Sequence, residues 1–269
     1  MGLFDVHAHL THPRLLPRAE DVLANARAAG LTSIISNGLN PEDNAAVERL
    51  AAAHPDLVRP AYGLYPVDAV LPEMSAAGIE YPRAPGPWTG EDAVEDVRAR
   101  VGGAIAVGEI GLDGYWVPQE FWDRQEQLFR RLVQIALDHD KPIIIHTRKR
   151  ERRTFEILEE MGATRVNWHC FGSKVKLARR IAGELGHHLS IPANARRSES
   201  FTRMLQTLPR EQILLETDCP YLPPERDTTN EPATVAGTCA YAAELWGETV
   251  DGVRAQLEDN YQALFGVPA

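Results

Sequence analysis

Two histidines separated by a single residue stand near the start of the chain, in the segment FDVHAHL at residues 4–10. In an extended strand, side chains two positions apart point to the same face, so His7 and His9 would lie side by side. Neighbouring imidazoles of this kind can bind a metal ion together. They can equally be two polar side chains on a wet strand face, and the pair alone leaves both interpretations open.

Further residues that can bind metals follow apolar segments elsewhere in the chain. Four such segments lead to Glu109, His146, His169 and Asp218. If these segments are parallel strands of a barrel, their carboxyl ends converge on one face, where active sites lie. A single histidine or acid after a strand is often a structural hydrogen-bonding residue or a helix cap. Six candidates at corresponding places, counting the two first histidines, favour a metal centre.

The composition of this set predicts the number and kind of ions. Six side chains exceed the four ligands of a tetrahedral zinc ion, so we expect two divalent ions, with one carboxylate able to bridge them. Mixed imidazole and carboxylate ligands favour Zn²⁺, Mn²⁺ or Mg²⁺ over a calcium site made only of oxygens. Because no cysteine is among the six, a closed structural zinc site is disfavoured.

Short apolar segments that alternate with amphipathic ones must position these residues. Gly30, Gly162 and Gly186 stand where C-terminal helix caps are expected. Eight alternating units in 269 residues predict an α/β fold, a TIM (β/α)8 barrel that forms a single domain over 1–269, with a doubly wound sheet as the alternative. The predicted strands are 2–9, 31–36, 58–66, 104–110, 141–147, 164–170, 187–192 and 212–218, and the predicted helices are 19–30, 41–54, 121–140, 152–162 and 173–186.

Residues 67–92 interrupt this alternation, with prolines at 72, 82, 85 and 87. We expect a long loop, with room for a short helix, between the third strand and its helix. Loops of this length are often functional, and a neutral insertion is the other interpretation.

Composition limits the classes of function. The net charge of −10 and the pI of about 5.4 exclude broad nucleic-acid binding driven by lysine and arginine alone, although metal ions and a local basic patch could still hold an anion. No segment approaches the ~18 apolar residues that span a bilayer, and no secretory signal is found. The three cysteines form no CxxC pair. We therefore expect a reduced cytoplasmic protein without an obligate protein partner.

Several further segments are spread over the chain nearly from end to end: DVHAHL (5–10), VGEIGLD (107–113), glutamines 125 and 127 with phenylalanine 129, KPIIIHTR (141–148), HCF (169–171), LLETDCPYLPP (214–224), NEP (230–232), and asparagine 260 with LF (264–265). In these segments and in their order, the chain resembles the TatD family of metal-dependent deoxyribonucleases, within the amidohydrolase-like barrels. The combination of EIGLD with ETDCPYL is distinctive, whereas HxH alone is common.

The resemblance implies a role for each site residue. His7, His9 and Asp218 would hold one metal ion, His146 and His169 the second, and Glu109 would bridge both. Asp218 also stands where the family's water-activating acid stands, so Asp218 and Glu109 are the predicted catalytic residues. Arg148 occupies the arginine position of the family's HxR segment. Asn230 and Glu231 would line the site from the loop after strand 8.

The chain departs from the family pattern on the substrate side. Tyr65 and Pro66 stand where the family commonly has His-Pro, and Thr229 replaces the arginine of the RNEP segment. The segment after HCF is one residue shorter than usual. A histidine and a basic residue are therefore missing, which affects substrate handling more than metal binding.

Several other residues near the site have both a functional and a structural interpretation. Tyr65 and Trp116 are candidates for stacking on a base, Tyr115, Phe171 and Tyr221 are more typical of packing, and Cys170 and Cys219 of small buried residues. Asp5 is expected to support the site or to form core hydrogen bonds. Among the cations of HTRKRERR and SKVKLARR, Arg148 and then Lys149 and Lys174 are predicted phosphate contacts, and the others are solvated helix faces.

The function predicted from these residues is hydrolysis of phosphodiester bonds in DNA by a metal-activated water, in an exonuclease-like manner at single-stranded ends. The alternative keeps the metal centre and changes the bond to a phosphomonoester, an ester or an amide, as in misacylated tRNA. A third hypothesis is a non-catalytic protein that keeps the metals for stability or binding.

Overall fold

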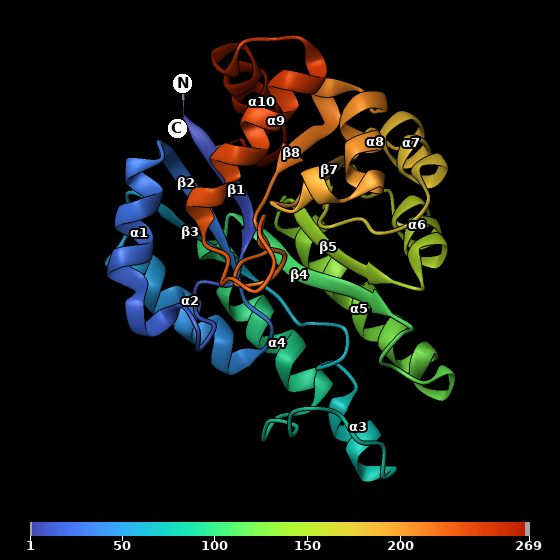
Figure 1. The fold of residues 1–269 in the computed structure, drawn as a ribbon. Helices are drawn as coiled ribbons and strands as arrows, with labels where there is room; N and C mark the ends of the chain where they lie inside the picture. The colour runs from blue at the N-terminus through green and yellow to red at the C-terminus, as the bar shows by residue number, and fades with distance from the viewer. Residues whose placement is uncertain (1, 267–269) are drawn as a thin grey trace.

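The computed structural model describes residues 2–266 and is a TIM (β/α)8 barrel, as predicted (Figure 1). Its eight strands form one parallel sheet in the order β1 to β8, each strand paired with the next along the chain. A doubly wound sheet would reverse its strand order, so this alternative is excluded. The strands are β1 (Leu3–Ala8), β2 (Leu31–Asn37), β3 (Val58–Tyr62), β4 (Ala106–Asp113), β5 (Ile143–Arg148), β6 (Val166–Trp168), β7 (His188–Ile191) and β8 (Ile213–Leu215).

Helices cover the outside of this barrel. Gly30, Gly162 and Gly186 have φ values of +88°, +67° and +65°, so glycine supplies the left-handed residue just after α1, α6 and α7, as predicted. The helices are α1 (Ala19–Ala28), α2 (Pro41–Ala53), α3 (Leu71–Ala76), α4 (Gly90–Arg100), α5 (Trp122–Asp138), α6 (Glu151–Glu160), α7 (Val175–Glu184), α8 (Glu199–Thr207), α9 (Val235–Trp246) and α10 (Val250–Phe265).

The first and last strands meet at a seam. Where they come together, the His9 amide donates to the Cys219 carbonyl at 2.9 Å, and the Asp218 amide donates to the His7 carbonyl at 2.9 Å. These bonds lie just beyond the end of β8, at the carboxyl face of the barrel. The seam therefore fixes the chain at three of the predicted metal ligands.

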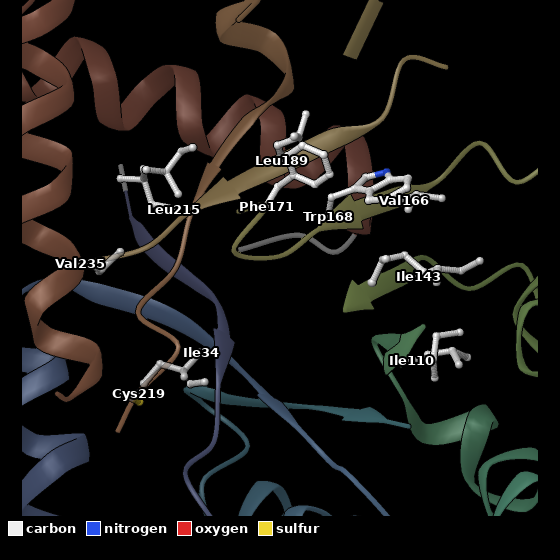
Figure 2. Packing of buried hydrophobic residues seen from close by; sticks show 14 of the residues in the cluster. Ile34, Ile110, Ile143, Val166, Trp168, Phe171, Leu189, Leu215, Cys219 and Val235 are labelled. Carbon is white, nitrogen blue, oxygen red and sulfur yellow. The ribbon is translucent and has the colours of Figure 1, made fainter. Parts of the chain in front are cut away.

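Two apolar layers hold the barrel together. Strand side chains that face outward pack under the helices; Figure 2 shows Ile110, Ile143 and Val166 of the neighbouring strands β4, β5 and β6 in this layer. The inward-facing layer fills the barrel floor, where the Phe4 ring stacks on Tyr261 of α10 with centroids 4.2 Å apart. Truncation of a buried aromatic residue typically costs about 3–5 kcal/mol. The floor cluster comprises Phe4, Val6, Ile35, Ala61, Ile105, Ala106, Ile144, Leu214, Tyr261, Leu264 and Phe265.

The expected loop at residues 67–92 contains one short helix, α3, and leads to α4, which begins at Gly90. Thr89 and Asp92 form a capping box at the start of α4. Helix α3 and the chain after it extend away from the barrel at the lower edge of Figure 1. Over residues 2–266, no helix combines the length and the apolar character needed to cross a membrane.

Candidate metal centre

His7 of β1 and His9, which directly follows this strand, lie side by side inside the barrel mouth. Their Nε2 atoms are 3.2 Å apart, and both side chains are buried. The Nδ1 atom of His9 faces the Asn37 carbonyl at 3.3 Å, which leaves Nε2 free to bind an ion. The His7 ring stacks on His169 with centroids 3.8 Å apart. Burial and the charge of His169 lower the pKa of His7 to about 3, so His7 is neutral and able to act as a ligand.

Glu109 directs its two carboxylate oxygens to two different groups of residues. Oε2 lies 3.5 Å from the Nε2 atoms of both His7 and His9. Oε1 lies 2.8 Å from His146 Nδ1 and 3.3 Å from His169 Nε2. The carboxylate therefore lies between two sets of imidazole nitrogens, and each of its oxygens faces one set.

Asp218 completes the first set. Its Oδ1 lies 3.7 Å from His7 Nε2 and 3.4 Å from His9 Nε2. Each of these two nitrogens is thus 3.2–3.7 Å from the other three ligand-type atoms. A tetrahedral ion with bonds of about 2.0–2.1 Å separates its ligand atoms by about 3.4 Å. The distances from the two histidine nitrogens to both carboxylates are close to this value. His7, His9 and Glu109 have all their ligand atoms within 4.8 Å of one another, and Asp218 approaches the two histidines of that group.

The second set has three members. Besides the two distances to Glu109 Oε1, His146 Nδ1 and His169 Nε2 are 3.4 Å apart. Glu109, His146 and His169 can therefore hold an ion, and so can His7, His9 and Glu109, whose ligand atoms lie within 4.8 Å of one another. All six predicted ligands meet at one place, although Glu109 lies inside β4 rather than at its end. The pairing of β4 with β5 is irregular between Val107 and Ile110, so side chains there do not alternate regularly between the two faces of the sheet.

The two predicted catalytic acids are ionised despite their burial. Burial alone would raise the pKa of Glu109, but the charge of His169 and hydrogen bonds from three histidines lower it well below its usual range. For Asp218, burial also opposes ionisation, and the hydrogen bond with His9 and the charges of nearby histidines lower its pKa overall. Both carboxylates can therefore bind cations, and Asp218 can accept a proton.

Two further carboxylates orient the second histidine set, and sequence reasoning gave them no role. Asp113 Oδ2 lies 3.1 Å from His146 Nε2, so this nitrogen donates a hydrogen bond and Nδ1 is left for an ion. Glu216 Oε1 lies 3.6 Å from His169 Nδ1, and Glu216 accepts hydrogen bonds from Ser190 and the Cys170 amide. Glu216 is also a possible ligand, because it lies within reach of His7 and His169. The spacing E-x-D at 216 and 218, directly after the apolar segment that forms β8, was the available signal.

A cavity of about 1350 Å³ opens above these ligands. Tyr65 is half-buried at its wall, and its ring meets that of His146 edge-on with centroids 4.9 Å apart. The Arg148 guanidinium lies 3.6 Å from the centre of the Tyr115 ring, a cation–π contact that fixes an exposed side chain at the rim. Four cations line the cavity: Arg83, Arg148, Lys149 and Lys174.

Arg83 reaches the cavity from the long loop after α3, and sequence reasoning missed it. Its guanidinium pairs with the buried carboxylate of Asp68, which also accepts a hydrogen bond from Asn40 at 2.9 Å. Tyr81, from the same loop, lines the cavity and meets Trp116 edge-on at 5.4 Å. The loop thus contributes to the site, which favours the functional interpretation of residues 67–92.

Two predicted substrate residues lie elsewhere, and their assignment to the cavity wall needs correction. Asn230 is fully buried and donates hydrogen bonds to the carbonyls of Thr217, Tyr221 and Leu222, so it holds the loop after β8 in shape. The Glu231 carboxylate is bound to Arg18 and Asn25 at 2.8 and 3.1 Å. Neither side chain is among those that line the cavity, because these contacts turn both away from it.

The remaining candidates divide between core and rim. Phe171 and Cys219 are fully buried, in agreement with the packing interpretation, whereas Cys170 is half-buried and lines the cavity. Burial raises the pKa of the Cys170 thiol well above its usual range, so it is neither ionised nor a good nucleophile. Tyr115, Trp116 and Tyr221 are exposed.

Comparison with known proteins gives matches over nearly the full length of the chain. A family model described as "TatD related DNase" matches residues 4–266. Deoxyribonuclease TATDN3 of Homo sapiens is 28% identical over 276 residues, which cover 98% of this chain and 95% of that protein. The uncharacterized metal-dependent hydrolase YabD of Bacillus subtilis is 29% identical over 272 residues, 98% and 99% of the two chains. The crystal structure of YJJV, a TatD homologue from Escherichia coli k12, superposes with a TM-score of 0.83 at 26% identity, covering 99% of this chain and 98% of that one.

Proposed function

Since this chain belongs to the TatD family of metal-dependent hydrolases, as its motifs predicted, we propose that it cleaves phosphodiester bonds of DNA from single-stranded ends. The observation that carries the proposal is the position of Glu109, whose two oxygens face two separate sets of histidines. Such a bridging carboxylate is typical of sites that hold two ions for the hydrolysis of phosphate esters.

In this proposal, His7, His9 and Asp218 would hold one divalent ion, His146 and His169 would hold the second, and Glu109 would contribute to both. The interatomic distances of 2.8–3.7 Å support this assignment, because they suit ligands of common ions. Two bound ions would supply an activated water and offset the charge that develops on the phosphate. Zn²⁺, Mn²⁺ and Mg²⁺ are the candidates for their identity.

Asp218 acts as the general base. Its carboxylate is ionised, faces the cavity and lies beside His7 and His9, so it can take the proton of the attacking water. Its backbone is fixed by the hydrogen bond from its amide to the His7 carbonyl. Glu109 is the second catalytic residue, because its position sets the distance between the two histidine sets.

The substrate is held from the rim. Arg148 presents its guanidinium to the phosphate, and its contact with Tyr115 limits the entropy lost on binding. Tyr65 lines the wall beside His146 and offers an aromatic face to a base. Arg83, paired with Asp68, places guanidinium donors at the cavity from the long loop in a chain that lacks the family's histidine after strand 3 and its arginine before NEP.

The test is an activity panel on the purified protein with Zn²⁺, Mn²⁺ or Mg²⁺ added in turn. Labelled single-stranded DNA, a chromogenic phosphomonoester and an acylated tRNA are compared as substrates. We expect nucleotides to be released from the DNA end, and Glu109→Gln and Asp218→Asn to lower this rate by at least ~100-fold, as for loss of a catalytic group.

The loss of activity in Glu109→Gln and Asp218→Asn would exclude a contaminating nuclease, and a matched variant controls for the general effect of replacing one side chain. His139→Gln changes an exposed histidine outside the cavity and should cleave DNA as the wild type does. If DNA stays intact while the phosphomonoester or the acylated tRNA is cut, the proposal is wrong and the protein hydrolyses another kind of bond.

A further inference from the structure

Nine cations follow β5 and β6 in the segments HTRKRERR and SKVKLARR, and the structure divides them into two classes. Arg150, Arg152, Arg153 and Arg180 each form an ion pair with a glutamate, as expected of solvated helix faces. The other five have no acidic partner anywhere in residues 2–266: Arg148, Lys149, Lys174, Lys176 and Arg179.

The unpaired cations share a location. Arg148 and Lys149 line the cavity above the candidate metal centre, and Lys174 stands where that cavity meets a second, more open groove. Lys176 and Arg179 line this groove, which has a volume of about 510 Å³. None of the four paired arginines lines either space. The groove and the cavity share Ser173 and Lys174, so the two spaces adjoin each other.

The groove runs between α7 and α8, which are neighbours on the outside of the barrel (Figure 1). Lys176 and Arg179 are three residues apart on α7 and so lie on one face of that helix. Arg203 of α8 faces them from the opposite wall and also has no acidic partner among the described residues. Glu199 is the acid of this groove, against four lining cations, Lys174, Lys176, Arg179 and Arg203.

Such an arrangement is unusual in a chain with 38 acidic and 28 basic residues. Most surface arginines of this protein have a glutamate or an aspartate within 4 Å, so acids were available to neutralise these cations as well. Exposed, unpaired cations spaced along an open groove bind a series of phosphates better than one small anion, which needs converging donors.

We propose that this groove, lined by Lys174, Lys176, Arg179 and Arg203, binds the backbone phosphates of the DNA strand that lies outside the catalytic cavity. The inference rests on the proposed function and extends it, because it makes the substrate a polynucleotide rather than a small phosphate ester. The strand would enter past Lys174 and lie between α7 and α8. Affinity from such contacts falls steeply with salt, because each neutralised phosphate releases a counterion.

The test measures binding separately from cleavage. A fluorescent single-stranded oligonucleotide, long enough to extend from the cavity into the groove, is titrated with protein in a chelator and followed by anisotropy. In the variant Lys176→Ala/Arg179→Ala/Arg203→Ala, we expect affinity to fall roughly tenfold or more at low salt. The slope of log K against log salt should decrease by about 2, since each single-strand phosphate contact contributes about 0.7.

A second triple variant controls for net charge. Arg27→Ala/Arg98→Ala/Arg131→Ala removes three ion-paired arginines outside the groove and should bind the oligonucleotide as tightly as the wild type. Five of the six replaced residues are exposed and Arg131 is half-buried, and thermal unfolding checks that both variants fold. Equal affinity and salt slope in the groove variant and the wild type, or an equal loss in the control, would overturn the proposal. Wild-type protein that binds DNA through the groove without hydrolysing it would instead refute the proposed function alone.

Discussion

The carboxylate of Asp5 accepts hydrogen bonds from both the amide and the hydroxyl of Thr217, at 2.9 and 2.6 Å. Asp5 lies on β1 and Thr217 follows β8, so the two bonds join the first and last strands of the barrel. Both residues are fully buried. Because His7 and Asp218 are close neighbours of this pair along the chain, it holds two candidate metal ligands at a fixed separation. Asp5 therefore forms core hydrogen bonds, which is one of the two roles expected for it.

Loss of the Thr217 hydroxyl should therefore destabilise the fold. Thr217→Val keeps the shape of the side chain but removes both the donor to Asp5 Oδ2 and the acceptor of the Cys219 amide, so two buried polar groups lose this partner. We expect the free energy of unfolding to fall by about 1–3 kcal/mol, the usual cost of an unsatisfied buried polar group. Urea denaturation followed by fluorescence measures this change.

The chain contains a matched control for this substitution. Thr238 is also buried, but its hydroxyl has no hydrogen-bond partner among the described residues. Thr238→Val removes a polar atom that makes no bond, so stability should be unchanged or slightly higher. A cost at Thr238 equal to that at Thr217 would mean that the bond to Asp5 contributes nothing specific.

The convergence of the six candidate ligands could be predicted from the sequence because it depends on topology. Eight parallel strands bring their carboxyl ends together whatever the details of packing, so His7, His146 and His169 needed only to be placed on their strands. Glu109 lies beside the histidines, as expected, but it is not at a strand end: β4 continues to Asp113, and an irregular pairing near Glu109 changes which side chains face the interior.

The rest of the site depends on side-chain contacts that no spacing encodes. Asn230 belongs to a family motif, yet its amide is used to hold loop carbonyls and is fully buried. Arg83 comes from a proline-rich loop whose path has no periodic signal, and its place in the cavity follows from its pairing with Asp68. Asp113 and Glu216 act through histidines, and only the three-dimensional structure identifies those partners.

Asp113 is expected to tune the second histidine set without touching an ion. Its carboxylate accepts the hydrogen bond of His146 Nε2, which fixes the ring and makes Nδ1 a stronger ligand. Asp113→Asn keeps an acceptor but removes the charge, so affinity for one divalent ion should fall about 10- to 100-fold. Isothermal titration calorimetry measures this affinity when Zn²⁺ or Mn²⁺ is added to protein from which a chelator has removed bound metal.

The control for this variant is Glu184→Gln, which removes the charge of an exposed glutamate paired with Arg180 on α7. Its metal affinity should equal that of the wild type. Unchanged affinity in Asp113→Asn would show that His146 either binds no ion or needs no oriented tautomer.

Ion binding should also stabilise the folded protein. The candidate ligands come from strands β1, β4 and β5 and from the segments that follow β6 and β8, and an unfolded chain cannot bring them together. At a free ion concentration 100 times Kd, the free energy of unfolding should rise by about 2.7 kcal/mol per site. Thermal denaturation with and without a chelator measures the shift. His9→Gln should reduce it, and His139→Gln, at an exposed position, should not. A melting temperature that does not respond to any of the three ions would contradict the metal centre.

His187 should make the free energy of unfolding depend on pH. It is not one of the candidate metal ligands, so its titration is separate from theirs. It is fully buried, accepts a hydrogen bond from Trp168 Nε1 at 3.1 Å through Nδ1, and donates from Nε2 to the Ala163 carbonyl at 2.7 Å. Burial lowers the pKa of His187 from 6.5 to about 4, and the nearby His188 opposes its charge. Between these values the unfolded chain binds a proton that the folded protein does not bind.

The stability contributed by neutral His187 is therefore present above pH 6.5 and is lost as pH falls towards about 4. The pKa shift corresponds to roughly 3 kcal/mol at its full extent, at 1.36 kcal/mol per pH unit. His187→Gln can still accept from Trp168 and donate to Ala163 but does not titrate, so its unfolding free energy should fall less steeply across this range. Urea titrations at a series of pH values compare it with the wild type and with His139→Gln, which should follow the wild-type curve. Parallel curves for His187→Gln and the wild type would show that this histidine does not couple protonation to folding.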